Sequence, residues 1–180
     1  MNKEDVSNNR DTLRYQFQRK NIAVVSRRHK LPDGTIAEAD VIVHPGAALI
    51  VPFLEKDRII LLRQYRLALK SYLYEFPAGT LDPDETPLNC ARRELREETG
   101  YAAKKFKRLG MIYPVPGYAT ERILIYKAEQ LVPSPQKGDP DEIIRVCAFS
   151  RREIQKLFRQ GRIHDGKTVS AMAFSGLIAS

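Results

Sequence analysis

Residues 79 to 101 read GTLDPDETPLNCARRELREETGY, and this stretch decides the fold of the domain around it. Thr86 is a favoured N-cap residue, and Pro87 suits the first position of a helix because its missing N–H is not needed there. Gly100 suits the left-handed position at which helices commonly end. We therefore predict a helix over residues 87–99, entered from the loop before it.

Three glutamates of this helix share one face because they are spaced three and four residues apart: Glu94, Glu97 and Glu98. Carboxylates placed so closely repel one another, and the C-terminal end of a helix disfavours anions. A divalent cation would remove this penalty, and a set of oxygen ligands suits Mg²⁺ or Mn²⁺. The alternative is a solvated acidic face that is neutralised by neighbouring arginines, Arg92, Arg93 and Arg96.

The composition is that of an ordinary globular protein. The chain has 180 residues, 43% hydrophobic and 29% charged, which suffices for one domain or one domain with a small appendage. We find no apolar run long enough to cross a bilayer and no apolar secretory segment at the N-terminus. Cys90 and Cys147 are too few for a disulfide framework, so we expect a reducing, cytoplasmic setting.

The net charge of +8 admits three interpretations: nucleic-acid binding, a generally basic surface, or a site for small phosphorylated anions. The basic residues are scattered along the chain, and neither zinc-finger spacing nor an RNA-binding signature accompanies them. We therefore expect a small-molecule partner, with no role for a membrane and none for nucleic acid as the main ligand.

Residues 21–44 have the pattern of a β-hairpin, in which two β-rich stretches flank a turn signal at residues 31–34. Proline and glycine then interrupt the chain. We therefore predict an N-terminal segment over residues 1–45 and a main domain over residues 46–180. The polar residues 1–20 are expected to be partly disordered or helical.

In the main domain, strands outnumber helices and do not alternate with them regularly. The expected strands are residues 47–54, 58–65, 72–76, 106–113, 122–128 and 143–149. The expected helices are residues 87–99, 151–160 and 165–178, and a polar, proline-rich loop is expected over residues 131–141. This arrangement predicts an α/β (mixed α+β) sandwich.

The whole stretch from residue 79 matches Gly-x5-Glu-x7-Arg-Glu-apolar-x-Glu-Glu-x-Gly-apolar at every position, and it resembles the Nudix box. Seven positions of that pattern demand one residue type, so the match is specific. The resemblance extends more weakly over most of residues 20–178. It implies a Nudix-type α/β/α sandwich with an N-terminal β-hairpin appendage, and an enzyme that hydrolyses diphosphate bonds.

In the Nudix family the acids of the box helix bind the cations. Carried onto this sequence, the metal ligands are Glu94, Glu97 and Glu98, joined by the carbonyl of Ala78. Arg93 and Glu85 match positions that hold the loop against the helix or touch metal-bound water. The implied cofactor is Mg²⁺, for which Mn²⁺ can substitute. Cations on a diphosphate cancel its charge and lower the pKa of a bound water, so two monophosphate products are expected.

Outside the box, the chain resembles the branch of ADP-ribose pyrophosphatases and nucleoside diphosphate sugar hydrolases. The segments that carry this resemblance are residues 63–66 (RQYR), 75–79 (EFPAG), 113–118 (YPVPGY) and 142–146 (EIIRV), followed by two helices. Pro116 lies fifteen residues past Tyr101, where ADP-ribose enzymes typically carry a proline. The resemblance implies hydrolysis of ADP-ribose and related nucleoside diphosphate sugars to a nucleoside monophosphate and a sugar phosphate.

The resemblance also assigns substrate contacts, to Arg66, Glu75, Pro116 and Tyr118. The planar fork of Arg66 suits a diphosphate, although a surface arginine is the alternative. Glu142 matches a mobile acidic loop that supplies a catalytic base or a further metal ligand, and Asp139 and Asp141 compete for this role. The aromatic residue that stacks on the base is left open among Tyr15, Phe17, Tyr65 and Tyr118.

A two-stranded ribbon cannot build a core of its own, so the hairpin of residues 21–44 must pack on something. In the resembling branch it reaches a second subunit, which implies a homodimer whose sites draw on both chains. Arg27 or Arg28 would then be offered to the partner's diphosphate. The alternative is a monomer whose hairpin folds back on its own domain.

Two further classes of function compete with this one. The first is another Nudix substrate: GDP-mannose, a dinucleotide polyphosphate or a nucleoside triphosphate. The second is a non-catalytic module that binds nucleotides or RNA. Such modules usually lack some of the box acids, and none of those acids is missing here.

Overall fold

The structure is a computed structural model that describes residues 9–17, 21–136 and 142–178. The chain divides into two compact units. The first comprises Met1–Gly46 and Tyr113–Arg122, and the second comprises Ala47–Ile112 and Ile123–Ser180.

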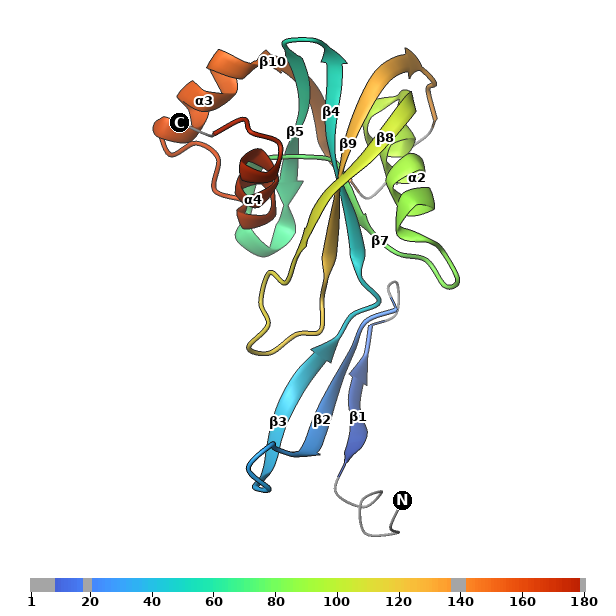
Figure 1. The fold of residues 1–180 in the computed structure, drawn as a ribbon, viewed down its shortest axis with the longest axis vertical. Helices are drawn as coiled ribbons and strands as arrows, with labels where there is room; N and C mark the ends of the chain where they lie inside the picture. Colours follow the sequence, from blue (N-terminus) through green and yellow to red (C-terminus); the bar gives the residue numbers. More distant parts are fainter. Residues whose placement is uncertain (1–8, 18–20, 137–141, 179–180) are drawn as a thin grey trace. The chain divides into compact units, whose positions relative to one another are not determined.

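The first unit is a three-stranded antiparallel sheet in the order β1-β2-β3, drawn in blue in Figure 1. Its strands are β1 (Arg10–Gln16), β2 (Ala23–Lys30) and β3 (Ile36–Val43). The predicted hairpin is confirmed as β2 and β3, which are joined by a turn in which Gly34 has a φ of 88°. A side chain at this left-handed position would be strained, which is why glycine occurs there.

The prediction that residues 1–20 are disordered or helical was wrong for residues 10–16, which form β1 and pair with β2. Apolar residues at alternate positions, Leu13, Tyr15 and Phe17, were the available signal. The pattern is short and is set among polar residues, so it becomes decisive only once β2 offers a partner for pairing.

The loop of residues 113–122 belongs to the first unit, although it follows the strand β8 (Tyr101–Ile112) of the second. The N–H of Ile42 donates to the carbonyl of Tyr118 at 2.8 Å, and the N–H of Thr120 donates to the carbonyl of Ile42 at 2.9 Å. The division expected at residues 45 and 46 did not anticipate that this loop would pair with β3.

The second unit is built on a seven-stranded mixed sheet in the order β10-β5-β4-β9-β8, with β6 paired to β5 and β7 paired to β4. Besides β8, its strands are β4 (Ala47–Glu55), β5 (Arg58–Arg66), β6 (Ser71–Glu75), β7 (Ala78–Thr80), β9 (Ile123–Pro133) and β10 (Ile144–Ser150). A short turn, η1 (Leu67–Leu69), joins β5 to β6. The helices are α2 (Pro87–Thr99), α3 (Arg151–Arg159) and α4 (Gly166–Phe174).

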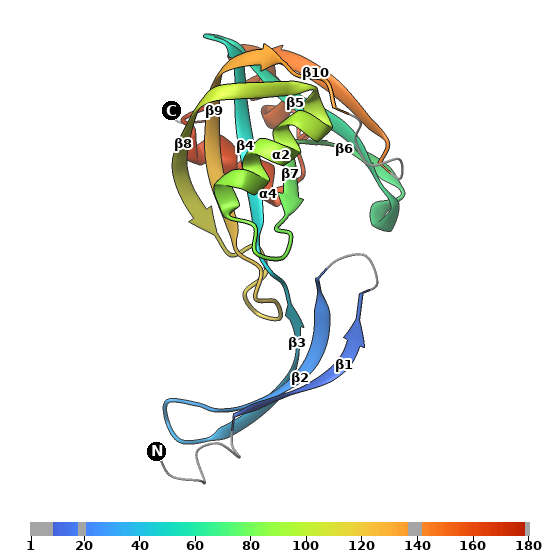
Figure 2. The same cartoon turned by 90° about the vertical axis from the view of Figure 1, so that its right-hand side faces the viewer.

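Helices cover both faces of this sheet, with α2 on one side and α3 and α4 on the other (Figures 1 and 2). The alternation of side chains along β4 explains how one strand serves both layers. Leu49 and Val51 belong to the core beneath α3 and α4, whereas Ala48 and Ile50 belong to the core beneath α2. The predicted α/β/α sandwich is therefore confirmed.

The remaining elements differ from their predicted bounds mainly at their ends. β8 begins at Tyr101 instead of 106, and β9 runs to Pro133 instead of 128, because Tyr101 pairs with Pro133 across the two strands. Several lysines in β8 weakened the apolar pattern there. α4 ends at Phe174, before the expected residue 178. In the described part of the chain, no helix has the length and hydropathy needed to cross a membrane.

Candidate functional site

The helix α2 has the predicted caps. The hydroxyl of Thr86 accepts a hydrogen bond from the N–H of Asn89 at 3.3 Å, and Gly100 ends the helix with a φ of 74°. These caps fix the phase of the helix. On its apolar side, Ala91 and Leu95 are fully buried in the core beneath it, and Leu88 is partly buried against that core. The acidic face therefore lies beside β7 and the loop that precedes the helix.

Arg93 binds that loop to the acidic face of the helix. Its guanidinium donates to both carboxylate oxygens of Glu85, at 3.0 and 2.8 Å. It also donates to Glu94 at 2.6 Å and to Glu97 at 3.1 Å. The hydrogen bonds from Arg93 lower the pKa of Glu85, and those to Glu85 raise the pKa of Arg93 above its usual range. The ion pair of Arg93 with Glu85 thus links the loop to the helix.

Glu98 is the most buried acid of the site, with 8% of its surface exposed. One of its oxygens accepts the N–H of Ala78 at 2.9 Å. Burial raises its pKa well above the ordinary value, and the charges of Glu94 and Glu142 raise it further. Burial likewise raises the pKa of Glu94, even though Arg93 opposes that shift. The site therefore concentrates negative charge that the described side chains only partly balance.

Gly79 is a glycine because Glu94 fills the space where a side chain would be. A Cβ atom built on Gly79 would lie 1.7 Å from Oε1 of Glu94, far inside any permitted contact. The absence of a side chain lets the Glu94 carboxylate lie against the backbone of β7. The carbonyl of Ala78, predicted as a further ligand, belongs to the same short strand.

The donors that gather here fit a hard divalent cation, because they are carboxylates and a backbone carbonyl, and burial disfavours their charge. Among the residues that the structure describes, no three histidine, cysteine or acidic side chains already form a complete metal site. Nη1 of Arg93 donates to both Glu94 and Glu97, so these two carboxylates are paired with a cation of the protein. Of the predicted ligands, Glu94 and Glu97 therefore share Arg93, and Glu98 accepts the N–H of Ala78.

Arg66 and Glu75 form a second charged cluster in the same unit. Arg66 donates to both oxygens of Glu75, at 2.7 and 2.6 Å, and Lys167 makes a second ion pair with that carboxylate. Burial alone would raise the pKa of Glu75, but the two cations outweigh it and lower the pKa. Glu75 is 1% exposed, so it underlies Arg66 and does not itself face solvent. Arg66 keeps 36% of its side chain exposed.

Glu142 is exposed, and its charge raises the pKa values of Glu94 and Glu98, which places it in their electrostatic neighbourhood. Its two competitors for the role of loop acid, Asp139 and Asp141, lie outside the described residues. Gln136, just before that gap, donates to Glu97 at 3.0 Å.

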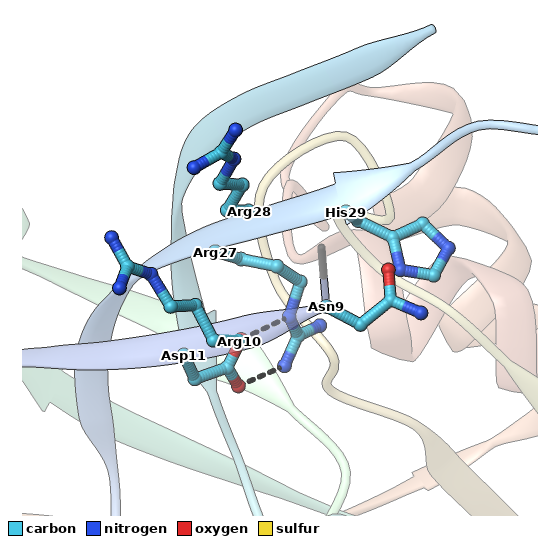
Figure 3. Close-up of a pocket in the computed structure, with 6 residues that line it drawn as sticks. All are labelled: Asn9, Arg10, Asp11, Arg27, Arg28 and His29. Atoms are coloured by element: carbon cyan, nitrogen blue, oxygen red, sulfur yellow. Dashed lines mark hydrogen bonds and ion pairs between the residues drawn. The ribbon is translucent and has the colours of Figure 1, made fainter. Parts of the chain in front are cut away.

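The other predicted substrate residues belong to the first unit. Figure 3 shows Arg27 against Asp11, to which it donates two hydrogen bonds of 2.8 and 2.7 Å, while Arg28 points away from this ion pair. Arg28 lies directly opposite Arg10 in the pairing of β1 with β2. A surface hollow of about 380 Å³ is lined by Asn9, Arg10, Asp11, Arg27, Arg28 and His29.

The loop of residues 113–122 carries Pro116 and Tyr118, both of them exposed. Of the other aromatic candidates for base stacking, Tyr15 and Phe17 pack edge to face with ring centroids 5.3 Å apart. Tyr65, in the second unit, makes a similar contact of 5.2 Å with Tyr72. Each aromatic thus has a defined local setting, and none of these settings singles out the one that stacks on a base.

Lys167 and Thr168 were not among the predicted site residues, although their side chains reach the segment before Gly79. The hydroxyl of Thr168 accepts a hydrogen bond from the N–H of Phe76 at 3.0 Å, and these two residues lie 92 positions apart in the chain. Asp165 caps the helix that holds both residues, and no local pattern around it indicates a contact with a distant strand.

Comparison with known proteins agrees with this geometry. A family model described as the NUDIX domain matches residues 43–171. The chain belongs to the Nudix family. It is similar to the ADP-ribose pyrophosphatase of Bacillus subtilis (strain 168), with 34% identity over 81% of this chain and 80% of the relative. It is also similar to the GDP-mannose pyrophosphatase of Citrobacter koseri, with 32% identity over 87% of this chain and 82% of the relative.

The fold of this Nudix protein is similar to that of a solved structure described as an ADP compounds hydrolase. The TM-score is 0.77 at 24% identity, over 93% of this chain and 90% of the other. The predicted resemblance to the ADP-ribose pyrophosphatase branch is confirmed by these relatives. Since the Nudix box is complete, the protein is a Nudix pyrophosphohydrolase, and enzymes of this family generally use a divalent metal ion.

The contact between Gly79 and Glu94 predicts the effect of one added methyl group. Gly79→Ala should displace the Glu94 carboxylate and lower kcat at least tenfold, while the melting temperature changes little because Gly79 does not have a positive φ. Phosphate release in a coupled assay measures kcat on any diphosphate that the wild type accepts. Gly166→Ala is the control, since a Cβ there meets nothing within 4 Å. Undiminished turnover by Gly79→Ala would contradict the assigned role of Glu94.

Proposed function

We propose that this enzyme hydrolyses the diphosphate bond of ADP-ribose and related nucleoside diphosphate sugars, giving a nucleoside monophosphate and a sugar phosphate. The observation that carries this proposal is the 34% identity, over four fifths of both chains, to a protein named ADP-ribose pyrophosphatase. The site supports it, since Arg66 offers a partly exposed guanidinium in the same unit as the buried acids. A planar fork suits the paired oxygens of a diphosphate.

The cofactor in this proposal is Mg²⁺, for which Mn²⁺ can substitute. Glu94, Glu97, Glu98 and the carbonyl of Ala78 would hold it, and when bound it would cancel phosphate charge and polarise phosphorus. The chain's own residues hold the loop and orient the substrate. Arg93 and Glu85 keep the loop fixed against the helix, and Arg66 binds the diphosphate while Glu75 holds its guanidinium.

The proton of the attacking water needs an acceptor, and we assign it to an acid of the loop that includes Glu142. The electrostatic proximity of Glu142 to Glu94 and Glu98 supports this choice. Asp139 and Asp141 are the alternatives in the same loop.

A homodimer is the proposed assembly, with the N-terminal sheet as the contact between subunits. The sheet exposes apolar side chains on β1, with Leu13 61% and Tyr15 56% exposed, as expected of a surface that packs on another.

Of the two arginines proposed to meet the partner's substrate, the geometry favours Arg28. Asp11 balances the charge of Arg27, whereas the residue opposite Arg28 in the pairing of β1 with β2 is a second cation, Arg10, so Arg28 contributes to an excess of positive charge that suits a diphosphate. We place the enzyme in the cytoplasm because Cys90 and Cys147 are both free thiols.

GDP-mannose is the second candidate substrate, because a relative of 32% identity is named GDP-mannose pyrophosphatase. Dinucleotide polyphosphates and nucleoside triphosphates are less favoured, as is a non-catalytic nucleotide-binding or RNA-binding module. The complete acid set speaks against the last of these.

The negative charge of Glu98 should destabilise the metal-free protein and should be required for catalysis. Glu98→Gln keeps an oxygen to accept the N–H of Ala78 but removes a buried charge, so the metal-free protein should melt at the same or a higher temperature while kcat falls by orders of magnitude. Glu97→Gln should lower kcat similarly, and the exposed Glu55→Gln is the control. EDTA should abolish activity, and Mg²⁺ or Mn²⁺ should restore it. Either variant retaining more than about a tenth of the activity would refute its assigned role.

The substrate class is tested with a panel of ADP-ribose, GDP-mannose, ADP-glucose, UDP-glucose, NADH and ATP. We expect ADP-ribose to be cleaved to AMP and ribose 5-phosphate, with ATP a poor substrate. Chromatography identifies the products, and kcat/KM ranks the substrates with Mg²⁺ and with Mn²⁺. A kcat/KM for ATP above that for every diphosphate sugar would overturn this assignment.

The assembly is tested by light scattering at micromolar concentration. A mass of about 41 kDa, twice the 20.6 kDa chain, is expected for the homodimer. Arg28→Ala should raise KM for ADP-ribose without changing this mass, while Arg27→Ala should affect KM less. Deletion of residues 1–44 should give monomers or aggregates with weak substrate binding. A truncated monomer with unchanged kcat/KM would rule out a site shared between subunits.

A further inference from the structure

The segment Glu75–Ala78, which comprises the end of β6, the two connecting residues and the start of β7, is held from three different elements. The N–H of Phe76 donates to the hydroxyl of Thr168 in α4 at 3.0 Å. The carbonyl of Pro77 accepts the N–H of Ile50 in β4 at 2.9 Å, and the N–H of Ala78 donates to Glu98 in α2. The first turn of α4, which the Nudix box does not include, is therefore part of the frame around the site.

Asp165 organises that turn. As the N-cap of α4, its carboxylate accepts the N–H of Thr168 at 3.0 Å and the hydroxyl of the same residue at 2.6 Å. Its other oxygen accepts Nζ of Lys167 at 2.9 Å. One carboxylate thus fixes both side chains that reach the connecting segment, Thr168 to Phe76 and Lys167 to Glu75.

The Glu75 carboxylate lies between two cations. Its Oε1 accepts from Nε of Arg66, and its Oε2 accepts from both Nη2 of Arg66 and Nζ of Lys167. A bidentate carboxylate can fix the plane of a guanidinium, but only if the carboxylate is itself held in place. Lys167 holds the Glu75 carboxylate from α4. In the described hydrogen bonds and ion pairs, Arg66 does not contact α4, so the two cations hold Glu75 independently.

We infer that Lys167 is a positioning residue for the substrate: it locks Glu75, and through Glu75 it orients the exposed edge of the Arg66 guanidinium towards the diphosphate. Asp165 and Thr168 complete the lock by fixing Lys167 and the backbone beside Glu75. This inference rests on the proposed function for its substrate, but the orientation of Arg66 is measurable without any substrate.

A role confined to capping α4 is the competing explanation, since the Lys167–Asp165 pair alone would stabilise the helix start. The two explanations differ in what reaches Arg66. Helix capping predicts a lower melting temperature and nothing more, whereas positioning predicts a change at the Arg66 side chain and in substrate affinity.

The first readout is the Nε–H resonance of Arg66 in ¹⁵N NMR spectra of the full-length, metal-free protein, assigned by its loss in Arg66→Lys. In the wild type, this proton should exchange slowly because Glu75 accepts it. Lys167→Met, which keeps the length of the side chain but not its charge, should shift the resonance and speed its exchange at least tenfold. Lys167→Arg should restore most of the protection, and the exposed Lys156→Met should leave the resonance unchanged. An unchanged resonance in folded Lys167→Met would overturn the inference.

The second readout is kinetic. On ADP-ribose with Mg²⁺, Lys167→Met should raise KM about tenfold with kcat within threefold of wild type, because an interaction that holds the bound substrate is loosened. In an Arg66→Ala background, the same change should alter KM less than twofold. An undiminished effect in that background would show that Lys167 does not act through Arg66. A wild type that cleaves none of the diphosphate sugars would refute the proposed function alone, with the NMR result still deciding the role of Lys167. Should Lys167→Met fail to fold, Asp165→Asn, which weakens the hold on Lys167, gives the same two measurements.

Discussion

The burial of Glu98 and Glu94 near one another is the constraint on which the site depends. Two carboxylates that lose solvent while they repel each other require neighbours chosen to tolerate them. The peptide N–H of Ala78 donates to Glu98, and the absence of a side chain at Gly79 leaves room for the Glu94 carboxylate. Arg93 pairs with Glu94 and also with the loop before the helix. The box pattern is thus a set of compensations for a concentration of negative charge, which a bound cation would complete.

The two cores of the sandwich both contribute to that arrangement. α2 carries the acids on one face of the sheet, and its apolar side packs on Ala48 and Ile50 of β4. α4 packs on the other face, yet its first turn reaches the segment between β6 and β7 through Thr168 and Lys167. The segment Glu75–Ala78 therefore takes part in hydrogen bonds with both helical layers, with α2 through Glu98 and with α4 through Thr168 and Lys167.

Local signals in the sequence were sufficient for much of this structure. The helix over residues 87–99, its caps and its acidic face all follow from spacings within one short stretch, and the hairpin follows from a turn signal between two β-rich runs. The strand β1 and the full length of β8 could not be predicted in the same way, because each is decided by a partner strand. The pair between Lys167 and Glu75 spans 92 positions, and no periodicity or motif within either segment indicates it.

Glu75 and Glu98 are both buried glutamates, but their surroundings differ in charge. Glu75 is the last residue of β6, and Glu98 contacts Ala78, the first residue of β7. Glu75 is enclosed by two cations that lower its pKa, so its charge is fully compensated within the protein. Glu98 receives one peptide N–H and lies among other acids that raise its pKa. A compensated carboxylate is suited to hold another side chain in place, whereas an uncompensated one is suited to take a cation. The contrast in charge balance therefore distinguishes the carboxylate that we propose to position Arg66 from the one that we propose to bind the metal ion.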